Sequence, residues 1–357
     1  MKILHTADLH LKVYNDERWQ ALQQLLDTGA AEQISLLLIS GDLFDHGADL
    51  LNLQDRVRAL FSNLPFTVLV LPGNHDYAAF TGGIYLGGSA RVLDDWRQPF
   101  QCGAVTVWGL PFEPAGGAEI LLRLREMAAR MEPGQINLLL YHGELLDAFF
   151  SRRDLGEEGS GRYMPARLAH FNELPCDYIL AGHFHTSYRV WTLPRQNGRE
   201  RYFVYPGSPA SVTRRETGRR LANLFEAGGP PREYPLDTFH YEARLVKLDP
   251  FSGTDPVEQV RRALKNLHPQ SRLLLTVAGY IDGSRGLDET ALAAEVRRLS
   301  AGCRAAEPEF TFRDIRAVLH DDLFRNFLEK LDRAESDGER KKRLRELAVR
   351  AMMEAKL

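Results

Sequence analysis

The chain has 357 residues, a formal net charge of -3 and 26% charged residues. These values are typical of a globular protein and exclude a disordered, collagen-like or supercharged chain. At roughly 150 residues per domain, the length predicts about two domains. The sequence has neither an apolar run of the roughly 18 residues that a membrane span needs nor a signal-peptide pattern after Met1, so we expect a cytoplasmic protein without membrane contact.

Short apolar runs that end in glycine or polar residues recur in the first two thirds of the chain. Their length and the turn residues around them predict buried strands at 36–39, 66–71, 105–108, 136–141, 178–181 and 202–205. Helical patterns lie between the early runs, over 19–26 and 120–131. Strands that alternate with helices predict an α/β layer architecture.

A Gly-Gly-Pro-Pro turn at 228–231 leads into a new part of the sequence, and we place a domain boundary near residue 240. Beyond it, the patterns predict strands and helices of a small α/β domain at 241–248, 257–267, 273–280, 292–299 and 310–318. Two amphipathic helices at 323–331 and 344–352 close the chain. The predicted domains are therefore 1–240, 241–320 and 321–357.

Side chains that can bind a metal follow one predicted strand after another. They are Asp8, His10, Asp42, Asn74, His142, His183 and His185. In open α/β sheets, sites form at the carboxyl ends of the strands, because several loops meet there while the strands hold them in place. Carboxylate, imidazole and amide ligands together suit Mn²⁺ best, with Fe²⁺, Zn²⁺ or Mg²⁺ also open, although imidazole disfavours a pure Mg²⁺ site.

Seven ligands are too many for one metal ion but suit two that share a carboxylate, for which Asp42 is the natural bridge. Two metal ions about 3.5–4 Å apart clamp a phosphoryl group and lower the pKa of a shared water. The expected chemistry is phosphoester hydrolysis.

These motifs taken in order resemble the calcineurin-like metallophosphoesterase superfamily. They are Asp8-Leu9-His10, Gly41-Asp42-Leu43-Phe44-Asp45, Gly73-Asn74-His75-Asp76, Tyr141-His142-Gly143 and Gly182-His183-Phe184-His185. Within the superfamily, the chain is most similar to the SbcD family of DNA double-strand-break repair nucleases, on the opening 3–10, the run 42–45 and Tyr205-Pro206-Gly207-Ser208-Pro209.

The resemblance covers about residues 1–240. It implies a four-layer metallophosphoesterase fold, in which two sheets are sandwiched between helices. It also implies a smaller α/β capping domain over 241–320, which limits how DNA reaches the metals, and a C-terminal helical pair over 321–357, which binds a partner ATPase.

The resemblance also implies a role for each site residue. One metal would be held by Asp8, His10, Asp42 and His185, and the other by Asp42, Asn74, His142 and His183. His75 matches the catalytic histidine of the family, and this agrees with its chemistry, because a leaving alkoxide needs a proton and histidine titrates closest to neutral pH. Some relatives carry a second catalytic histidine where this chain has Asp45, followed by His46, and which of the two takes that role stays open.

Basic residues offer two candidate contact surfaces. Lys12, Arg214, Arg215, Arg219 and Arg220 are candidates for contacts to DNA phosphates, and a solvated loop with ion pairs through Glu216 is the other interpretation. The final helix has an apolar stripe opposite its charges. It either packs on its own domain or, as the resemblance implies, docks on an SbcC-like ATPase of the SMC family. A homodimer is a further expectation from the family.

The main functional hypothesis is a metal-dependent DNA exonuclease, with endonuclease activity also open, that works in DNA repair with an SMC-like ATPase. The alternative is a small-molecule phosphodiesterase or phosphatase that uses the same binuclear site. Protein phosphatases of the superfamily carry an Arg after the Gly-Asp motif, and the stretch 45–47 has none. A scaffold without activity is a third hypothesis, which the complete ligand set disfavours.

Overall fold

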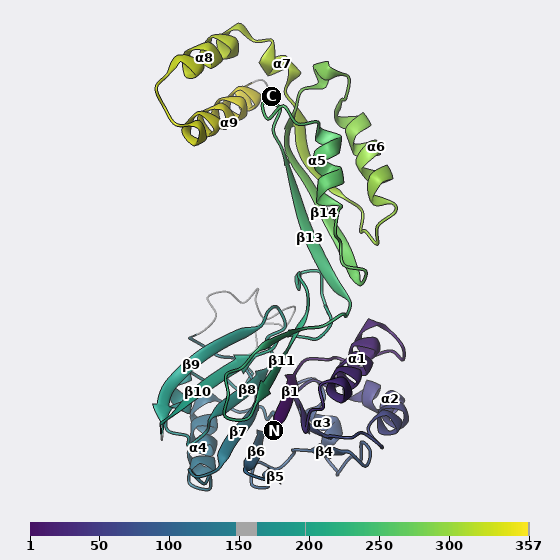
Figure 1. The fold of residues 1–357 in the computed structure, drawn as a ribbon, viewed down its shortest axis with the longest axis vertical. Coiled ribbons are helices and arrows are strands. Elements are labelled where there is room, and N and C mark those ends of the chain that lie inside the picture. The colour runs from purple at the N-terminus through teal and green to yellow at the C-terminus, as the bar shows by residue number, and fades with distance from the viewer. Residues whose placement is uncertain (148–162, 197, 356–357) are drawn as a thin grey trace. The chain divides into compact units, whose positions relative to one another are not determined.

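The computed structural model describes residues 1–147, 163–196 and 198–355 (Figure 1). The chain forms two compact units, residues 1–241 and 242–357. Within the described ranges, no helix combines the length and the apolar character that crossing a membrane requires.

The first unit contains two six-stranded sheets, with strand orders β12-β11-β1-β2-β3-β4 and β5-β6-β7-β8-β10-β9. Its elements in chain order are β1 (Lys2–Thr6), α1 (Glu17–Ala31), β2 (Leu36–Ser40), α2 (Gly47–Leu60), β3 (Thr67–Leu71), α3 (Tyr77–Phe80), β4 (Ala90–Val92), β5 (Phe100–Cys102), β6 (Val105–Leu110), α4 (Gly117–Ala128), β7 (Ile136–His142), η2 (Leu168–Phe171), β8 (Tyr178–Gly182), β9 (Arg189–Gln196), β10 (Arg199–Tyr205), β11 (Leu221–Glu226) and β12 (Glu233–Pro235).

The alternation of side chains along the strands explains how the two sheets stack. On β2, Leu36 and Leu38 belong to the core between the sheets, whereas Leu37 and Ile39 belong to the core under the helices. Strands β1, β3, β7, β8 and β10 alternate in the same way. A strand whose two faces are both buried reads as a continuous apolar run, which is the pattern that the sequence shows.

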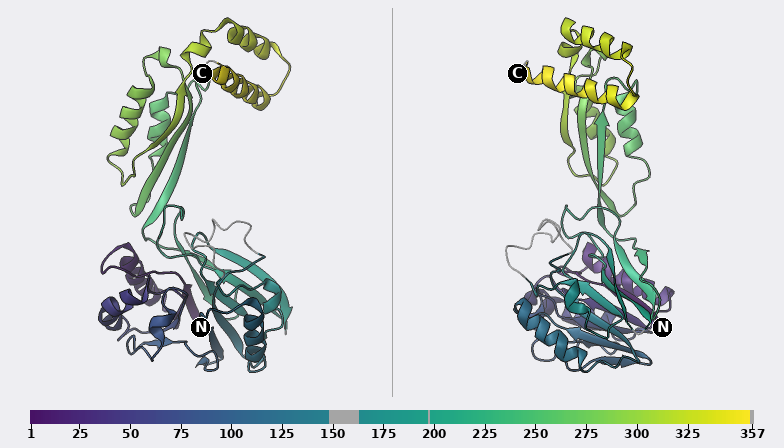
Figure 2. Two further views of the ribbon diagram at one scale, coloured as in Figure 1. Left: turned by 180° about the vertical axis from the view of Figure 1, so that it is seen from behind. Right: turned by 90° about the vertical axis from the view of Figure 1, so that its left-hand side faces the viewer.

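Helices cover the outer face of each sheet. Helices α1 and α2 lie over the first sheet and α4 lies over the second (Figure 2). Side chains of α1 and α2 belong to the core on the first sheet, and those of α4 and η2 belong to the core on the second. The Asp16 carboxylate caps α1 by accepting hydrogen bonds from the backbone N–H groups of Arg18 and Trp19. The four layers confirm the predicted metallophosphoesterase fold.

The second unit is a small α/β assembly around the sheet β13-β14-β15. Its elements are β13 (His240–Leu248), whose first residues belong to the first unit, and then α5 (Pro256–Ala263), β14 (Ser271–Ile281), η3 (Gly283–Arg285), α6 (Glu289–Ser300), β15 (Glu309–Asp314), α7 (Arg316–Leu319), α8 (Asp322–Arg333) and α9 (Gly338–Ala355). The prediction of a strand over 310–318 was wrong at its C-terminal end, because β15 ends at Asp314. Asp314 Oδ1 accepts the N–H groups of Gly283 and Arg316, at 3.0 and 2.9 Å, and the chain turns there into α7.

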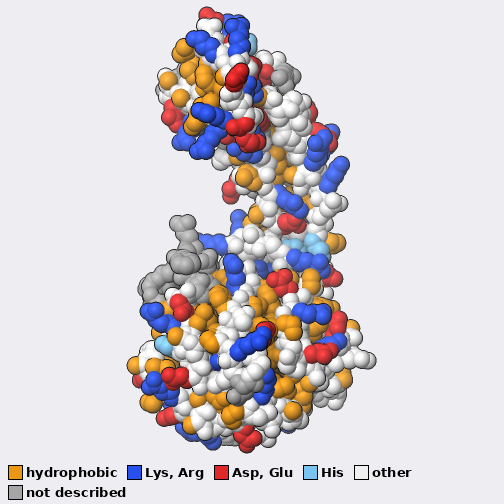
Figure 3. Space-filling model, turned by 60° about the vertical axis from the view of Figure 1, so that its left-hand side comes forward, with side chains coloured by type: hydrophobic (Ala, Val, Ile, Leu, Met, Phe, Trp, Pro, Cys, Tyr) orange, Lys and Arg blue, Asp and Glu red, His pale blue; other side chains and the backbone are white. Residues whose placement is uncertain are grey.

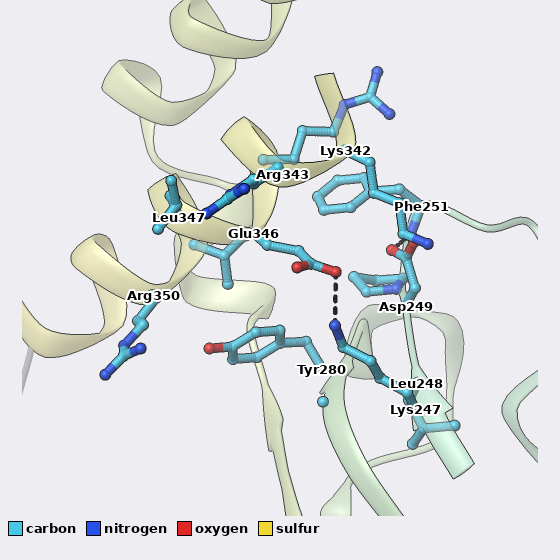
Figure 4. A pocket seen from close by; sticks show the side chains of 14 residues that line it. Lys247, Leu248, Asp249, Phe251, Tyr280, Lys342, Arg343, Glu346, Leu347 and Arg350 are labelled. Carbon is cyan, nitrogen blue, oxygen red and sulfur yellow. Dashed lines mark hydrogen bonds and ion pairs between the residues drawn. The ribbon is translucent and has the colours of Figure 1, made fainter. Parts of the chain in front are cut away.

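Helices α7 to α9 share a small core formed by Ile315, Val318, Phe324 and Val349. A pocket of about 320 Å³ lies between α9 and the ends of β13 and β14, where Lys247 Nζ lies 3.0 Å from Glu346 Oε1 (Figure 4). Over α8 and α9, Figure 3 shows hydrophobic side chains among Lys and Arg. Three leucines of α8 and α9 stay exposed outside this small core, namely Leu323, Leu344 and Leu347.

Candidate metal centre

The seven predicted ligands come from the carboxyl ends of strands in both sheets. Strands β1, β2 and β3 lead into Asp8, His10, Asp42 and Asn74, and strands β7 and β8 lead into His142, His183 and His185. Because the strands of each sheet run parallel here, their ends lie at one edge. The structure brings all seven side chains together.

One group of ligand atoms contains Asp8, His10 and His185, whose donor atoms lie within 4.8 Å of one another. The Nε2 atoms of His10 and His185 are 3.2 Å apart. Asp8 Oδ2 is buried and has no hydrogen-bond partner within the described ranges. Two imidazole nitrogens that face a buried carboxylate form a donor set that fits a divalent cation.

The second group centres on His142. Its Nε2 atom lies 2.9 Å from Asn74 Oδ1 and 3.2 Å from Asp42 Oδ2, and His183 Nδ1 lies 3.2 Å from the same Asn74 oxygen. Asp42 Oδ2 is also 3.8 Å from His10 Nε2 in the first group. Asp42 therefore faces both groups, which fits a carboxylate shared by two cations.

Four of the seven ligands have a backbone conformation that L-residues rarely adopt. The φ angles of Asp8, His10, Asp42 and His183 are 56°, 49°, 51° and 95°. Hydrogen bonds between the first two loops hold this conformation, since His10 N donates to Asp42 O at 2.9 Å. Left-handed non-glycine residues cost free energy and cluster at functional sites.

Glycines before the ligands make room for the opposite loops. A Cβ atom on Gly73 would lie 2.1 Å from Asp42 Oδ1, and one on Gly41 would lie 1.8 Å from His142 Nδ1. Gly41 also has a φ of 95°. The Gly-Asp and Gly-Asn pairs of the motifs are therefore a packing requirement of the site.

The buried carboxylates and imidazoles of the cluster shift the pKa values of one another. Burial raises the pKa of Asp8. Burial would also raise the pKa of Asp42, but the charges of His142 and His10 outweigh it and lower that pKa. Burial disfavours the charged form of His142, yet the carboxylates of Asp42 and Asp8 raise its pKa to about 10. A metal that binds His142 must therefore displace a proton.

A second set of polar groups contacts the Nδ1 atoms of three histidine ligands. Asp45 Oδ1 lies 3.4 Å from His10 Nδ1, Glu216 Oε1 lies 3.6 Å from His185 Nδ1, and His142 Nδ1 donates to the Ser40 carbonyl at 2.8 Å. Such partners fix the ring orientation of a metal-binding histidine. The interpretation of Glu216 as part of a solvated loop was wrong, because Glu216 is fully buried.

Asp45 and His46, the two candidates for the role of the second catalytic histidine, have different surroundings in the structure. The Asp45 carboxylate also contacts Lys12 Nζ at 2.8 Å and Arg18 Nη1 at 3.3 Å. Burial would raise its pKa, but hydrogen bonds from His10 and Lys12 outweigh burial and lower it. His46 has a side chain that is 66% exposed. Asp45 is thus an ionised positioning group for His10, and His46 lies at the surface.

Replacing Asp45 by asparagine should weaken metal binding by about 10- to 100-fold, because the amide loses the charge that orients His10. Calorimetric titration of metal-stripped protein measures the change. Asp49→Asn is the matched control, since the Asp49 carboxylate lies nearby and contacts His46 Nδ1 at 3.6 Å. An unchanged dissociation constant in Asp45→Asn would contradict the positioning role.

His75 lies directly beside the cluster. Its backbone N–H donates to Asp42 Oδ1 at 3.0 Å, and its ring lies 4.8 Å from the His10 ring, centroid to centroid. The ring nitrogen Nδ1 is 2.9 Å from the Asp45 carbonyl oxygen. Because a carbonyl only accepts, Nδ1 carries a proton, and proton exchange with a substrate falls to Nε2.

Asp76, next to His75, has a structural role. Its two carboxylate oxygens accept the backbone N–H groups of Phe44 and Gly73, at 3.0 and 2.8 Å. Burial and the charge of Asp42 raise the pKa of Asp76 to about 7. The side chain does not cap α3. Asp76 therefore ties together the loops that carry Asp42 and Asn74.

The structure corrects one candidate DNA contact. Arg220 is 3% exposed and donates to the carbonyl oxygens of His185, Thr186 and Ser208, so it holds the loop of a ligand and does not face solvent. Among the other candidates, Arg219 pairs with Asp237, and Lys12 pairs with Asp45 while half exposed. Arg214 and Arg215 are exposed.

Known proteins similar to this chain include a DNA repair protein and a nuclease subunit. The chain is 26% identical to the DNA double-strand break repair protein Mre11 of Saccharolobus solfataricus, over 53% of this chain and 51% of that protein. It is 34% identical to SbcD, the D subunit of the nuclease SbcCD of Escherichia coli K12, over 22% of each protein. The matches thus span about half or less of these relatives.

Among solved structures, TT1561 of Thermus thermophilus aligns over 62% of this chain and 92% of its own, with a TM-score of 0.39 and 12% identity. The family model described as calcineurin-like phosphoesterase matches residues 1–187, which include every predicted ligand. The chain therefore belongs to the calcineurin-like phosphoesterase family.

Proposed function

We propose that this protein is a metal-dependent DNA nuclease that hydrolyses phosphodiester bonds at a binuclear site. The main support for the proposal is the position of Asp42 between the two ligand groups. Its Oδ2 atom lies 3.8 Å from His10 Nε2 and 3.2 Å from His142 Nε2. A bound pair of divalent cations, with Mn²⁺ the best match to these ligands, supplies a nucleophile from water and offsets charge on the phosphoryl oxygens.

His75 would donate the proton that the leaving oxygen needs. The 2.9 Å hydrogen bond from His75 Nδ1 to the Asp45 carbonyl oxygen orients the ring. Nε2 is then the nitrogen that would donate a proton to the substrate. The hydrogen bond from the His75 backbone N–H to Asp42 Oδ1 holds the proton donor close to the shared ligand. General acid catalysis of this kind contributes about 10²- to 10⁴-fold to the rate.

The similarity to Mre11 and to SbcD supports DNA as the substrate. The metal site alone does not select DNA over a smaller ester, because the reacting phosphoryl group is the same. Exposed Arg214 and Arg215 lie in the loop after β10, which contacts the loop of His185 through Ser208 N, and they are available to DNA phosphates. We therefore assign exonuclease activity on DNA as the first expectation, with endonuclease activity as a second.

The test is hydrolysis by metal-stripped protein to which Mn²⁺ is returned. End-labelled linear DNA, a small phosphodiester and a phosphomonoester are compared under the same conditions. Cleavage of DNA that depends on Mn²⁺ supports the nuclease. Turnover of the small esters with DNA left intact would instead favour a small-molecule phosphodiesterase or phosphatase.

We further propose that the second unit serves DNA access and partner binding, with residues 241–320 as a cap and 321–357 as the docking element for an SbcC-like SMC-family ATPase. Exposed apolar side chains on the terminal helices support this, since Leu323 and Leu347 are 68% and 55% exposed. A large exposed apolar side chain on an amphipathic helix is suited to a groove on another protein.

Replacing Leu347 by glutamate should weaken binding of the ATPase by about tenfold or more, because a charge would enter the buried centre of the interface. Surface plasmon resonance with the ATPase measures this loss. Leu122→Glu is the control, since Leu122 is 59% exposed on α4 in the first unit. If both variants bind the ATPase as the unsubstituted protein does, the terminal helices are not the docking element.

A further inference from the structure

A second pocket lies in the first unit beside the loop that carries Asn74 and His75. Its volume is about 420 Å³, which is within the range of small-ligand sites. Pro72 and Tyr77, which flank the ligand loop, both line it. Tyr77 N donates to Gly73 O at 3.0 Å, so Tyr77 is held to the start of the loop that carries Asn74 and His75.

Aromatic side chains make up much of this wall: Tyr77, Phe80, Trp96 and Phe112. The Tyr77 and Phe112 rings are 5.1 Å apart, and Phe112 lies 6.1 Å from Tyr163. Tyr163 in turn lies 5.2 Å from the ring of the ligand His183. A series of ring contacts therefore leads from the pocket to the metal centre.

Trp96 is surrounded by guanidinium groups. Arg97, Arg123 and Arg130 place their Cζ atoms 5.2, 5.6 and 6.0 Å from the centre of its ring. Arg123 is bound to both carboxylate oxygens of Glu113, and the guanidinium charges of Arg97 and Arg130 interact with the Asp95 carboxylate. Of these arginines, Arg97 both lines the pocket and is exposed, so it can also contact an external group.

The charges at the pocket indicate what kind of group it takes. Asp94, Asp95 and Glu113 on its wall offset the charges of Arg97 and Arg123, so the pocket is not a strongly positive phosphate site. Partly exposed Trp96 and Tyr77 can instead present their rings to a flat, apolar face. Nucleobases have such faces, and they stack on aromatic side chains in many single-strand binding proteins.

We propose that this pocket holds a nucleobase of the DNA strand whose phosphate is at the metal centre. The proposal rests on the proposed nuclease function and specifies its substrate. Trp96 and Tyr77 would stack on the base, and Arg97 would meet a neighbouring phosphate. A base inside a duplex is covered by its neighbours, so the pocket accepts only a base that has left the stack.

The test compares two oligonucleotides of the same backbone, one normal and one with abasic nucleotides around the cleavage site that is mapped for the unsubstituted protein. Trp96→Ala should raise the KM for the normal strand by at least about fivefold, since stacking on one aromatic ring accounts for a factor of this size or more. On the abasic strand, the same substitution should leave KM unchanged, and Trp96→Phe should keep most of the affinity for the normal strand.

Tyr85→Ala is the matched control, because Tyr85 is a 55% exposed aromatic residue with Arg58 at 5.7 Å and does not line the pocket. Equal losses on the normal and abasic strands, or no loss on either, would overturn the base pocket. A protein that hydrolyses small phosphodiesters but neither strand would instead overturn the proposed nuclease function. The two failures are therefore distinguishable.

Discussion

Asp42→Asn should abolish DNA cleavage, with a loss of at least about a thousandfold, and should lower the number of bound metal ions. The carboxylate is fully buried and lies between the two ligand groups, within 4 Å of a nitrogen of each. Asparagine keeps the shape and the contact to His75 N but removes the negative charge. Metal ions contribute several kcal/mol of transition-state stabilisation, which corresponds to a loss of this size.

Two measurements on the same preparation check this expectation: metal content after dialysis, and the rate of DNA hydrolysis. Asp237→Asn serves as the control, because Asp237 forms a surface ion pair with Arg219. The unsubstituted protein and the control should bind equal amounts of metal. An Asp42→Asn protein with full metal content and normal cleavage would show that no shared carboxylate is needed.

His75→Ala should keep the metal ions and lose about 10²- to 10⁴-fold in turnover. The His75 ring contacts the ring of the ligand His10, and its Nδ1 hydrogen bond to Asp45 O orients it, but His75 is not one of the seven predicted ligands. Loss of the imidazole therefore removes the proton donor while the metal site stays intact. Single-turnover kinetics on DNA, with metal content measured in parallel, give both quantities.

The leaving group provides the control for this assignment. A p-nitrophenolate leaving group is a weak base and needs little protonation, so the His75→Ala loss should be much smaller for a p-nitrophenyl phosphodiester than for DNA. Equal losses on both substrates would point to a damaged site. DNA cleavage at the parental rate would rule out His75 as the proton donor.

The strands of the first unit that could be predicted from sequence are mainly those buried on both faces. Strand β2 has five buried residues in a row, which gives a continuous apolar run. Strand β9 has one buried residue among eight and lies at the edge of its sheet, so its sequence carries no such run. Helix α2 was missed for a similar reason, because only Leu50, Leu53 and Val57 of its fourteen residues are buried.

The ligand set could be proposed from sequence because each ligand sits in a short motif at the end of an apolar run. The groups that position those ligands could not. Glu216 is far along the chain from His10 and Asp8, and only the folded loop brings it to His185, with hydrogen bonds from Ser208 Oγ and Val212 N. Arg220 looks like a surface charge in the sequence, but the same loop folds over it.

The most direct test of the binuclear nuclease is a titration of metal-stripped protein with Mn²⁺, in which bound ions and cleavage of linear DNA are measured at each addition. We expect binding to saturate at two ions per chain, with cleavage appearing as the second site fills. Saturation at one ion, or DNA cleavage by the metal-free protein, would contradict the shared role of Asp42 and the function built on it.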